Sequence, residues 1–196
     1  MKLNRLALVI IILTALTFST SAAEYNLIAG EPLGLFNNTF SGYYSKISVR
    51  NAHVVAFPLS YSEAVNVKYL SAGVEYRKYL SGNLAGLYFE TNLAASLQDK
   101  AYDPDILTLT PAFVVGYRID AGQGLFVEPE LTYTLPMVSV GGTALEVAKD
   151  FESSFNIVLG LDNVYPNGIF FAPRLSFSYS GGTLHAVGKL FLGYGF

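Results

Sequence analysis

The chain has 196 residues and a net charge of −3, and only 14% of its residues are charged while 52% are apolar. Soluble domains carry roughly 25% charged residues, and the 12 basic residues here are scattered singly, which argues against an ordinary soluble domain and against a nucleic-acid-binding protein. The sequence has no cysteine, which excludes disulfides, thiolate metal sites, a cysteine nucleophile and a lipoprotein-type anchor.

The first residues have the pattern of a secretory signal peptide. Lys2 and Arg5 precede an apolar stretch from Leu6 to Phe18, and Ser21-Ala22-Ala23 offers the small side chains of a cleavage site. The apolar stretch is shorter than the about 20 residues of a transmembrane helix. We therefore expect residues 1–23 to be a cleaved signal peptide and residues 24–196 to form a single exported domain.

The rest of the chain alternates with a period of two, which is the pattern of β-strands. In chain order the alternation predicts ten strands, with eight as the alternative if part of residues 24–42 lies outside the barrel. The expected strands are residues 24–36, 40–50, 52–61, 68–80, 84–97, 106–119, 125–135, 151–163, 169–180 and 184–196.

The composition of the two strand faces decides the kind of sheet. One face is apolar, and the other carries mostly Gly, Ala, Ser, Asn and Tyr with few long charged side chains. A polar interior and an apolar exterior are typical of outer-membrane barrels, so we predict an all-β, closed antiparallel transmembrane β-barrel. Pro111, Pro129 and Pro173 fall on the apolar face inside strands, where each removes a ladder donor, and predict a bulge or a position near a rim.

The connections predict the orientation. Turns at residues 81–83, 120–124 and 166–168 are short and contain glycine, as periplasmic turns do, and both termini are then periplasmic. Residues 136–150 form the longest expected extracellular loop and the best candidate for contact with a surface ligand, with either a short helix over Ala144–Lys149 or an ordinary loop conformation.

The last expected strand ends with alternating apolar and aromatic residues: Leu190, Leu192, Tyr194 and the terminal Phe196. This pattern resembles the C-terminal assembly signal of bacterial outer-membrane proteins, although Phe191 stands where that pattern often has glycine. The resemblance implies two partners, membrane lipid and the barrel-assembly machinery.

Further segments carry a second resemblance, over about residues 25–135. Asn26-Leu27, Glu75–Tyr79 and Gly86–Phe89 are similar to segments of uncharacterised outer-membrane barrel families, and the chain resembles the small OmpA/OmpX-like barrels in general. The resemblance implies the outer membrane of a Gram-negative-type envelope, and it supplies no chemistry to transfer.

Candidate catalytic groups are few. His185 is expected near the extracellular end of the last strand, with Ser176, Ser178 and Ser180 on the strand before it, which allows a Ser-His hydrolase acting on outer-leaflet lipid. Barrel lipid-A deacylases place serine directly after the histidine, whereas Ala186 follows here. A rim histidine is the favoured interpretation, and no catalytic residue, cofactor or metal ligand is predicted.

Charged side chains on the polar face form the most distinctive set. In the predicted hairpin, Glu75 faces Glu90, and Arg77 is diagonal to Glu90. We expect these side chains to form a structural ion network that fills the lumen. The set consists of Glu75, Arg77, Glu90, Arg118, Glu128, Glu130, Glu152, Arg174 and Lys189.

Three functions remain open. A structural or surface-interaction barrel is favoured, because barrels of about eight strands are filled by side chains, whereas aqueous porins have about 16 to 18. A narrow ion or solute channel is the first alternative, and an outer-leaflet lipid-modifying enzyme is the second.

Overall fold

The computed structural model describes residues 24–64, 67–100, 103–135, 138–141, 144–147, 152–161 and 168–196. Twelve strands and one short 3-10 helix lie in these ranges. They are β1 (Glu24–Gly30), η1 (Pro32–Asn37), β2 (Thr39–Ser48), β3 (His53–Ala64), β4 (Val67–Tyr79), β5 (Gly86–Lys100), β6 (Asp103–Gly122), β7 (Leu125–Thr134), β8 (Val138–Gly141), β9 (Ala144–Val147), β10 (Glu152–Leu161), β11 (Gly168–Ser180) and β12 (Thr183–Gly195). The predicted signal peptide lies outside the described residues.

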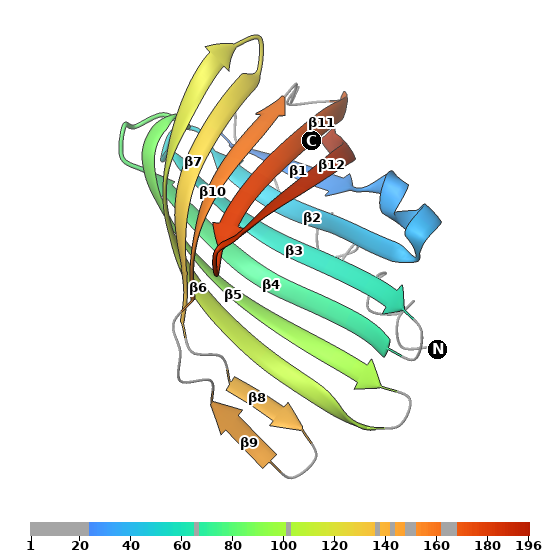
Figure 1. The fold of residues 1–196 in the computed structure, drawn as a ribbon. Helices are drawn as coiled ribbons and strands as arrows, with labels where there is room; N and C mark the ends of the chain where they lie inside the picture. The colour runs from blue at the N-terminus through green and yellow to red at the C-terminus, as the bar shows by residue number, and fades with distance from the viewer. Residues whose placement is uncertain are drawn as a thin grey trace.

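Ten of the strands form a closed antiparallel barrel (Figure 1). Neighbours in the sequence pair around the ring from β1 to β7, β7 then pairs with β10, and β12 pairs with β1. The prediction of ten strands is confirmed, and the eight-strand alternative is wrong. The reason is that both β2 and β3 pair along their full lengths within the wall.

The first strand is shorter than predicted. β1 ends at Gly30, and residues 32–37 form η1 instead of continuing the strand. Pro32 starts this helix and Asn38, with φ of 53°, ends it in the left-handed region. Proline lacks the N–H that a ladder needs, so the chain leaves the barrel wall at this point.

The longest loop contains a hairpin. β8 pairs with the β6 segment Ile106–Leu109, and β9 pairs with β8, so the sheet extends beyond the barrel (Figure 1). The short helix considered for Ala144–Lys149 is therefore wrong over residues 144–147, because these residues join a ladder begun by β6. Residues 148 and 149 lie outside the described residues.

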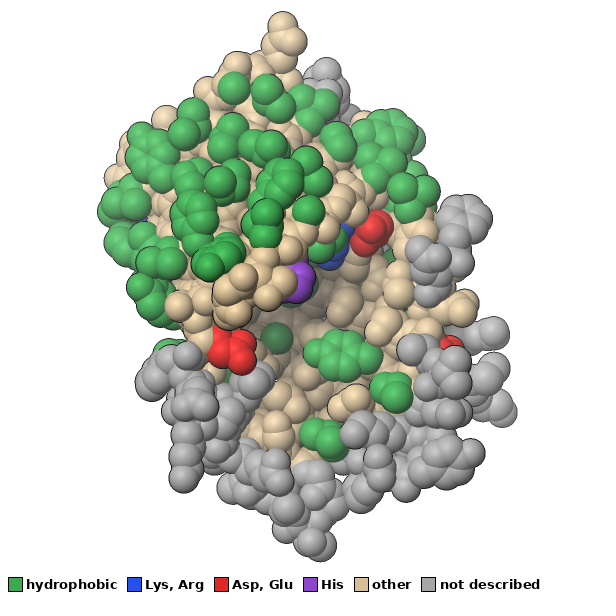
Figure 2. Space-filling view, viewed as in Figure 1, with side chains coloured by type: hydrophobic (Ala, Val, Ile, Leu, Met, Phe, Trp, Pro, Cys, Tyr) green, Lys and Arg blue, Asp and Glu red, His purple; other side chains and the backbone are tan. Residues whose placement is uncertain are grey.

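The outer surface of the barrel is apolar, as the alternation predicts. Outward side chains of β5, such as Leu87 and Leu93, are exposed, and Figure 2 shows hydrophobic side chains over the part of the outer wall that faces the viewer. An exposed apolar surface of this extent is unfavourable in water and favourable against lipid. The fold is that of a transmembrane barrel.

The prolines of the outer face lie where a ladder stops. The β10–β11 ladder ends at the pair of Gly160 with Arg174, and Pro173 is the next residue of β11 beyond that pair. Pro129 lies in a gap of the β6–β7 ladder, between residues 127 and 130. Pro111 lies beyond the last β6–β7 pair, Ala112 with Thr134. A proline, which has no N–H to donate to the ladder, is tolerated at such positions. The predicted location near a rim is therefore not needed to explain these prolines.

The two ends of the barrel differ. At one end, here named the terminal end, lie Glu24, Phe196 and the turns at residues 49–52, 80–85 and 123–124; the opposite end is named the loop end. The described residues contain no helix long and apolar enough to cross a membrane.

Candidate functional site

Three aromatic rings fill the lumen at the terminal end. Each ring lies across a glycine of the neighbouring strand: Tyr88 across Gly116, Phe126 across Gly160 and Phe170 across Gly193. A Cβ atom at any of these glycines would come within 2.3 to 2.4 Å of the ring. The rings are 0 to 1% exposed. Each ring can lie over the neighbouring strand because that strand has a glycine, with no side chain, at the facing position.

Arg77 is the centre of an ion network above these rings. Its Nε lies 2.7 Å from Glu90 Oε2, its Nη1 lies 3.2 Å from Glu128 Oε1, and its Nη2 lies 3.5 Å from Glu130 Oε1. These carboxylates come from β5 and β7, so one guanidinium joins three strands across the interior. The guanidinium also stacks on the Tyr88 ring at 4.1 Å.

Arg118 completes the network on β6. Its Nη1 lies 3.1 Å from Glu128 Oε1, and its Nε lies 2.8 Å from Asp120 Oδ1. Its guanidinium stacks 4.1 Å from the centre of the Phe126 ring, and the Tyr88 hydroxyl donates a hydrogen bond of 2.6 Å to Glu130. The side chains of Arg118, Glu90, Glu128 and Glu130 are more than four-fifths buried, and each is paired with an oppositely charged side chain, the arrangement that buried charges require.

The pairing within this network differs from the prediction. Glu75 lies opposite Asn92, and Arg77 lies directly opposite Glu90, so the predicted Glu75–Glu90 pair and the diagonal position of Arg77 are wrong. The turn spans residues 80–85, with Leu80 N–H donating to the Leu87 carbonyl. The hairpin is therefore centred between residues 83 and 84, one residue further along than a Glu75–Glu90 pair requires, which shifts the register by two.

Apolar side chains close the terminal end beneath the network. Leu84, in the β4–β5 turn, and Val54 each pack against two buried clusters. One cluster contains Tyr79, Tyr88, Ala52 and Val114, and the other contains Leu27, Ala29, Ile47, Phe170, Ala172 and Phe191. The β4–β5 turn thus folds under the lumen, and sequence alternation alone gives no signal for this contact.

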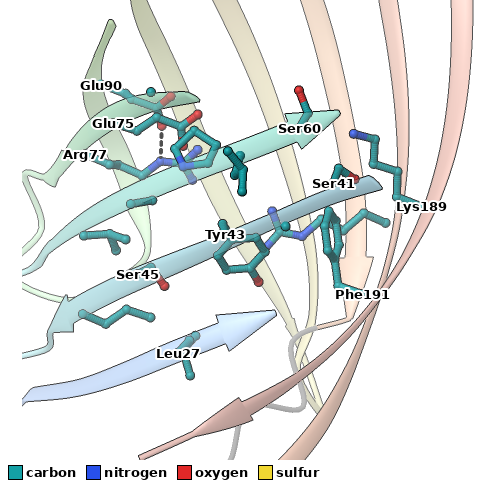
Figure 3. A pocket seen from close by; sticks show the side chains of 18 of the residues that line it. Leu27, Ser41, Tyr43, Ser45, Ser60, Glu75, Arg77, Glu90, Lys189 and Phe191 are labelled. Carbon is teal, nitrogen blue, oxygen red and sulfur yellow. Dashed lines mark hydrogen bonds and ion pairs between the residues drawn. The ribbon is translucent and has the colours of Figure 1, made fainter. Parts of the chain in front are cut away.

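A cavity of about 570 Å³ lies beside the network, lined by residues of β1 to β6 and of β11 and β12. Small inward residues such as Ser45, Ala56, Gly73 and Ala94 line its wall, and Figure 3 shows Glu75, Arg77 and Glu90 facing Lys189 and Phe191 across it. Because small side chains replace large ones toward the loop end, the lumen is not filled along its whole length.

The remaining predicted members of the network lie apart from it. Lys189 faces the cavity, and Glu152 lies on β10 opposite Thr134, toward the loop end. Within the described part of the chain, neither these two residues nor Glu75 forms an ion pair. Arg174 lies 5.8 to 6.0 Å from the rings of Phe191, Phe126 and Tyr43.

The two histidines are also placed. His185 lies opposite Ser178 in the β11–β12 ladder, and both are on the lumen side. The hydrogen bonds of the described residues include none between His185 and a serine. His53 is near the Tyr76 ring, 5.8 Å between centroids. The described residues contain no group of three or more His, Cys, Asp and Glu that could hold a metal ion.

The residues of the C-terminal pattern lie in the wall. Leu190, Leu192 and Tyr194 are on the face opposite to Lys189 and Phe191, and hence outward. Phe196 exchanges two backbone hydrogen bonds with Asn26, at 2.9 and 3.0 Å. The last residue of the chain therefore takes part in closing the barrel against β1.

Fold, apolar exterior and polar lumen together define an outer-membrane-type β-barrel. In structure, the chain is similar to the β-domain of the Bordetella autotransporter BrkA, with 11% identity, a TM-score of 0.42, and coverage of 89% of this chain and 98% of that one. It is also similar to the translocator domain of the autotransporter NalP from Neisseria meningitidis, with 11% identity, a TM-score of 0.36, and coverage of 98% and 95%. No protein-family model and no curated protein matches the sequence.

Proposed function

We propose that the protein is a non-conducting, non-enzymatic barrel of the outer membrane with a structural or surface-interaction role. The observation that carries this proposal is the closed terminal end, where Leu84 and Val54 join two apolar clusters beneath the Arg77 network. A lumen blocked at one end supports no steady passage of solute, while the longer connections at the loop end, including the β8–β9 hairpin, offer surfaces for a ligand.

The proposed orientation places the terminal end in the periplasm. Three supports are the predicted signal peptide, the short turns at this end, and the longer connections at the other, including the β8–β9 hairpin. Membrane lipid is then the partner of the outward side chains. The terminal half of the lumen is filled by side chains, as in the small OmpA/OmpX-type barrels. We propose a likeness to those barrels for this half only.

Conductance measurement tests the proposal. The full-length protein, folded in lipid vesicles and fused to planar bilayers, is expected to give no steady current, since rings and ion pairs occupy the lumen at the terminal end. Migration in mild SDS that changes on boiling, as expected for a closed barrel, serves as the folding control. Steady open channels from correctly folded protein would favour the narrow channel, for which the 570 Å³ cavity is the supporting observation.

The C-terminal residues are proposed to be read by the barrel-assembly machinery. Replacing Tyr194 and Phe196 by serine should reduce the amount of folded barrel in the outer membrane, measured by fractionation and the boiling-dependent shift. The matched control replaces the exposed Leu184 by serine. Leu184 lies on the same strand and the same face as Tyr194 but outside the C-terminal pattern. Equal amounts of folded protein in both variants would show that the terminal residues carry no signal.

A further inference from the structure

Polar side chains enclose an apolar run on the outer face of β3 and of β4. The run on β3 lies between His53 and Glu63, and the run on β4 lies between Lys68 and Lys78. Each pair is ten positions apart, which is roughly 33 Å along a strand, or about 25 Å across the membrane at a tilt of about 40°. An apolar band of about 25 Å is typical of membrane barrels, so these residues mark its two boundaries. The outward residues between them are Val55, Phe57, Leu59, Tyr61, Leu70, Ala72, Val74 and Tyr76.

The boundary at the loop end has charges of both signs. Glu63 lies opposite Lys68, and Lys68 lies opposite Asp99 on β5. Opposite charges on neighbouring strands stabilise each other. This boundary therefore has no excess of positive charge on these strands.

The boundary at the terminal end carries three cations on β2 to β4. Lys46 is on the outer face of β2, the exposed Arg50 is in the β2–β3 turn, and Lys78 lies opposite His53 on β4. Lys46, Arg50 and Lys78 are here named the cationic sector. The Lys78 Nζ donates a hydrogen bond to the backbone carbonyl of Asn51, which holds the ammonium beside the turn that carries Arg50. An ammonium has three donors, so two remain for a ligand.

The carboxylates near this sector compensate only one of its cations. Glu24, on the outer face at this end, is paired with Lys46 at 2.9 Å. Asp120 is paired with Arg118 at 2.8 Å, and the other lumen carboxylates lie on the opposite side of the wall. In the described part of the chain, neither Arg50 nor Lys78 takes part in an ion pair.

The rest of the outer face at the terminal end is apolar or aromatic. The exposed outward residues there, on β5, β6, β7, β11 and β12, are Leu87, Tyr117, Ile119, Leu125, Ile169, Phe171 and Tyr194. The positive charge of this boundary is therefore confined to one side of the barrel, and a partner that it attracts is expected on that side.

We propose that the cationic sector binds the phosphate head group of an anionic phospholipid. Arg50 and Lys78 contact the phosphate, because a guanidinium and an ammonium both form charge-assisted hydrogen bonds with phosphate oxygens. The acyl chains lie along Tyr76 and Val74, which continue from Lys78 into the apolar run. The inference rests on the proposed membrane location of the barrel, and it does not require a closed lumen.

The absence of tryptophan from the sequence allows a direct test. Tyr76→Trp places a reporter beside the cationic sector, and Tyr117→Trp places a matched reporter on the apolar side of the same end. Each full-length variant is folded in vesicles that mix phosphatidylcholine and phosphatidylglycerol, with bromine on the chains of one lipid. Quenching as a function of composition gives the preference for the anionic lipid at each reporter. We expect a preference of about fivefold at residue 76, since basic residues near a membrane surface attract anionic lipid, and none at residue 117.

Charge variants in the Tyr76→Trp background locate the head group. Arg50→Gln combined with Lys78→Gln should abolish the preference for phosphatidylglycerol. The control is Lys68→Gln, which removes an exposed lysine from the same strand and face as Lys78 but at the other boundary, and it should leave the preference unchanged. Raising the salt concentration to about 1 M should lower the preference, because salt screens exposed charges. Each variant is first checked for the boiling-dependent shift.

The outcomes separate this inference from the proposed function. Equal preferences at residues 76 and 117 mean that the whole barrel attracts anionic lipid, and they overturn the inference. A preference at residue 76 that survives the loss of Arg50 and Lys78 also overturns it. Loss of the preference when inorganic phosphate replaces chloride at the same ionic strength means that the site takes free phosphate, which overturns the assignment to lipid. A preference that depends on Arg50 and Lys78 supports the inference even if the barrel conducts, a result that would contradict the proposed function alone.

Discussion

The two halves of the lumen are built from the same strands but with different side chains. Along β4, the inward residues at the terminal end are Tyr79 and Arg77, whereas toward the loop end they are Gly73 and Ser71. The first pair packs against rings and carboxylates, and the second leaves a cavity. Strand number sets the width of the barrel, but the size of the inward residues decides which part is filled.

The largest expected effect comes from breaking the network of the filled half. Arg77→Gln removes the cation shared by Glu90, Glu128 and Glu130. Leaving buried carboxylates without their partner costs about 3 kcal/mol or more, which urea unfolding in lipid vesicles would measure. The control is Lys46→Gln, which breaks the Lys46–Glu24 pair, whose side chains are 35% and 27% exposed, and which should cost about 0 to 1 kcal/mol. Equal losses would mean that the network does not hold the terminal half together.

A second prediction tests which face of β5 meets lipid. Leu87 is 39% exposed on the outer face, while Asn92 lies on the lumen face opposite Glu75. An outward arginine costs roughly 2 to 4 kcal/mol near the bilayer midplane and less toward the interfaces. Leu87→Arg should therefore destabilise more than Asn92→Arg, whose guanidinium can reach Glu75. The reverse order in vesicle unfolding would invert the barrel faces.

A smaller effect should separate the glycines of the filled half from glycines elsewhere. Gly160→Ala places a Cβ 2.3 Å from the buried Phe126 ring, whereas at Gly188 the nearest atom is 4.0 Å away. Overpacking costs about 1 to 3 kcal/mol, and an exposed substitution about 0.5 kcal/mol or less. Similar unfolding free energies for Gly160→Ala and Gly188→Ala would show that the ring has room to move.

Much of the fold follows from the sequence because alternation fixes the side of each residue. The ten strands, the apolar exterior and the inward positions of Arg77, Glu90 and Glu128 all come from this one periodicity. Two-residue periodicity is insensitive to a register shift of two, however. Such a shift leaves every side chain on its face, so alternation alone does not distinguish a Glu75–Glu90 pair from the observed Glu75–Asn92 pair.

The short first strand and the closed end depend on features that alternation does not encode. Pro32 is a local signal for the end of β1, since it cannot donate to a ladder, and it could have shortened the predicted strand. The insertion of Leu84 beneath the lumen has no such signal, because a turn residue belongs to neither face. The cavity follows from side-chain size along several strands at once, which requires the register to be known.

Cysteine accessibility tests the difference between the two halves most directly, since the chain has no native cysteine. Ser60→Cys places a thiol on the cavity wall, and Asn83→Cys places one in the exposed β4–β5 turn. In vesicles with the barrel in one orientation, a membrane-impermeant maleimide should modify Ser60→Cys only from the loop end and Asn83→Cys only from the terminal end. Equal modification of Ser60→Cys from both sides would contradict a lumen closed at the terminal end.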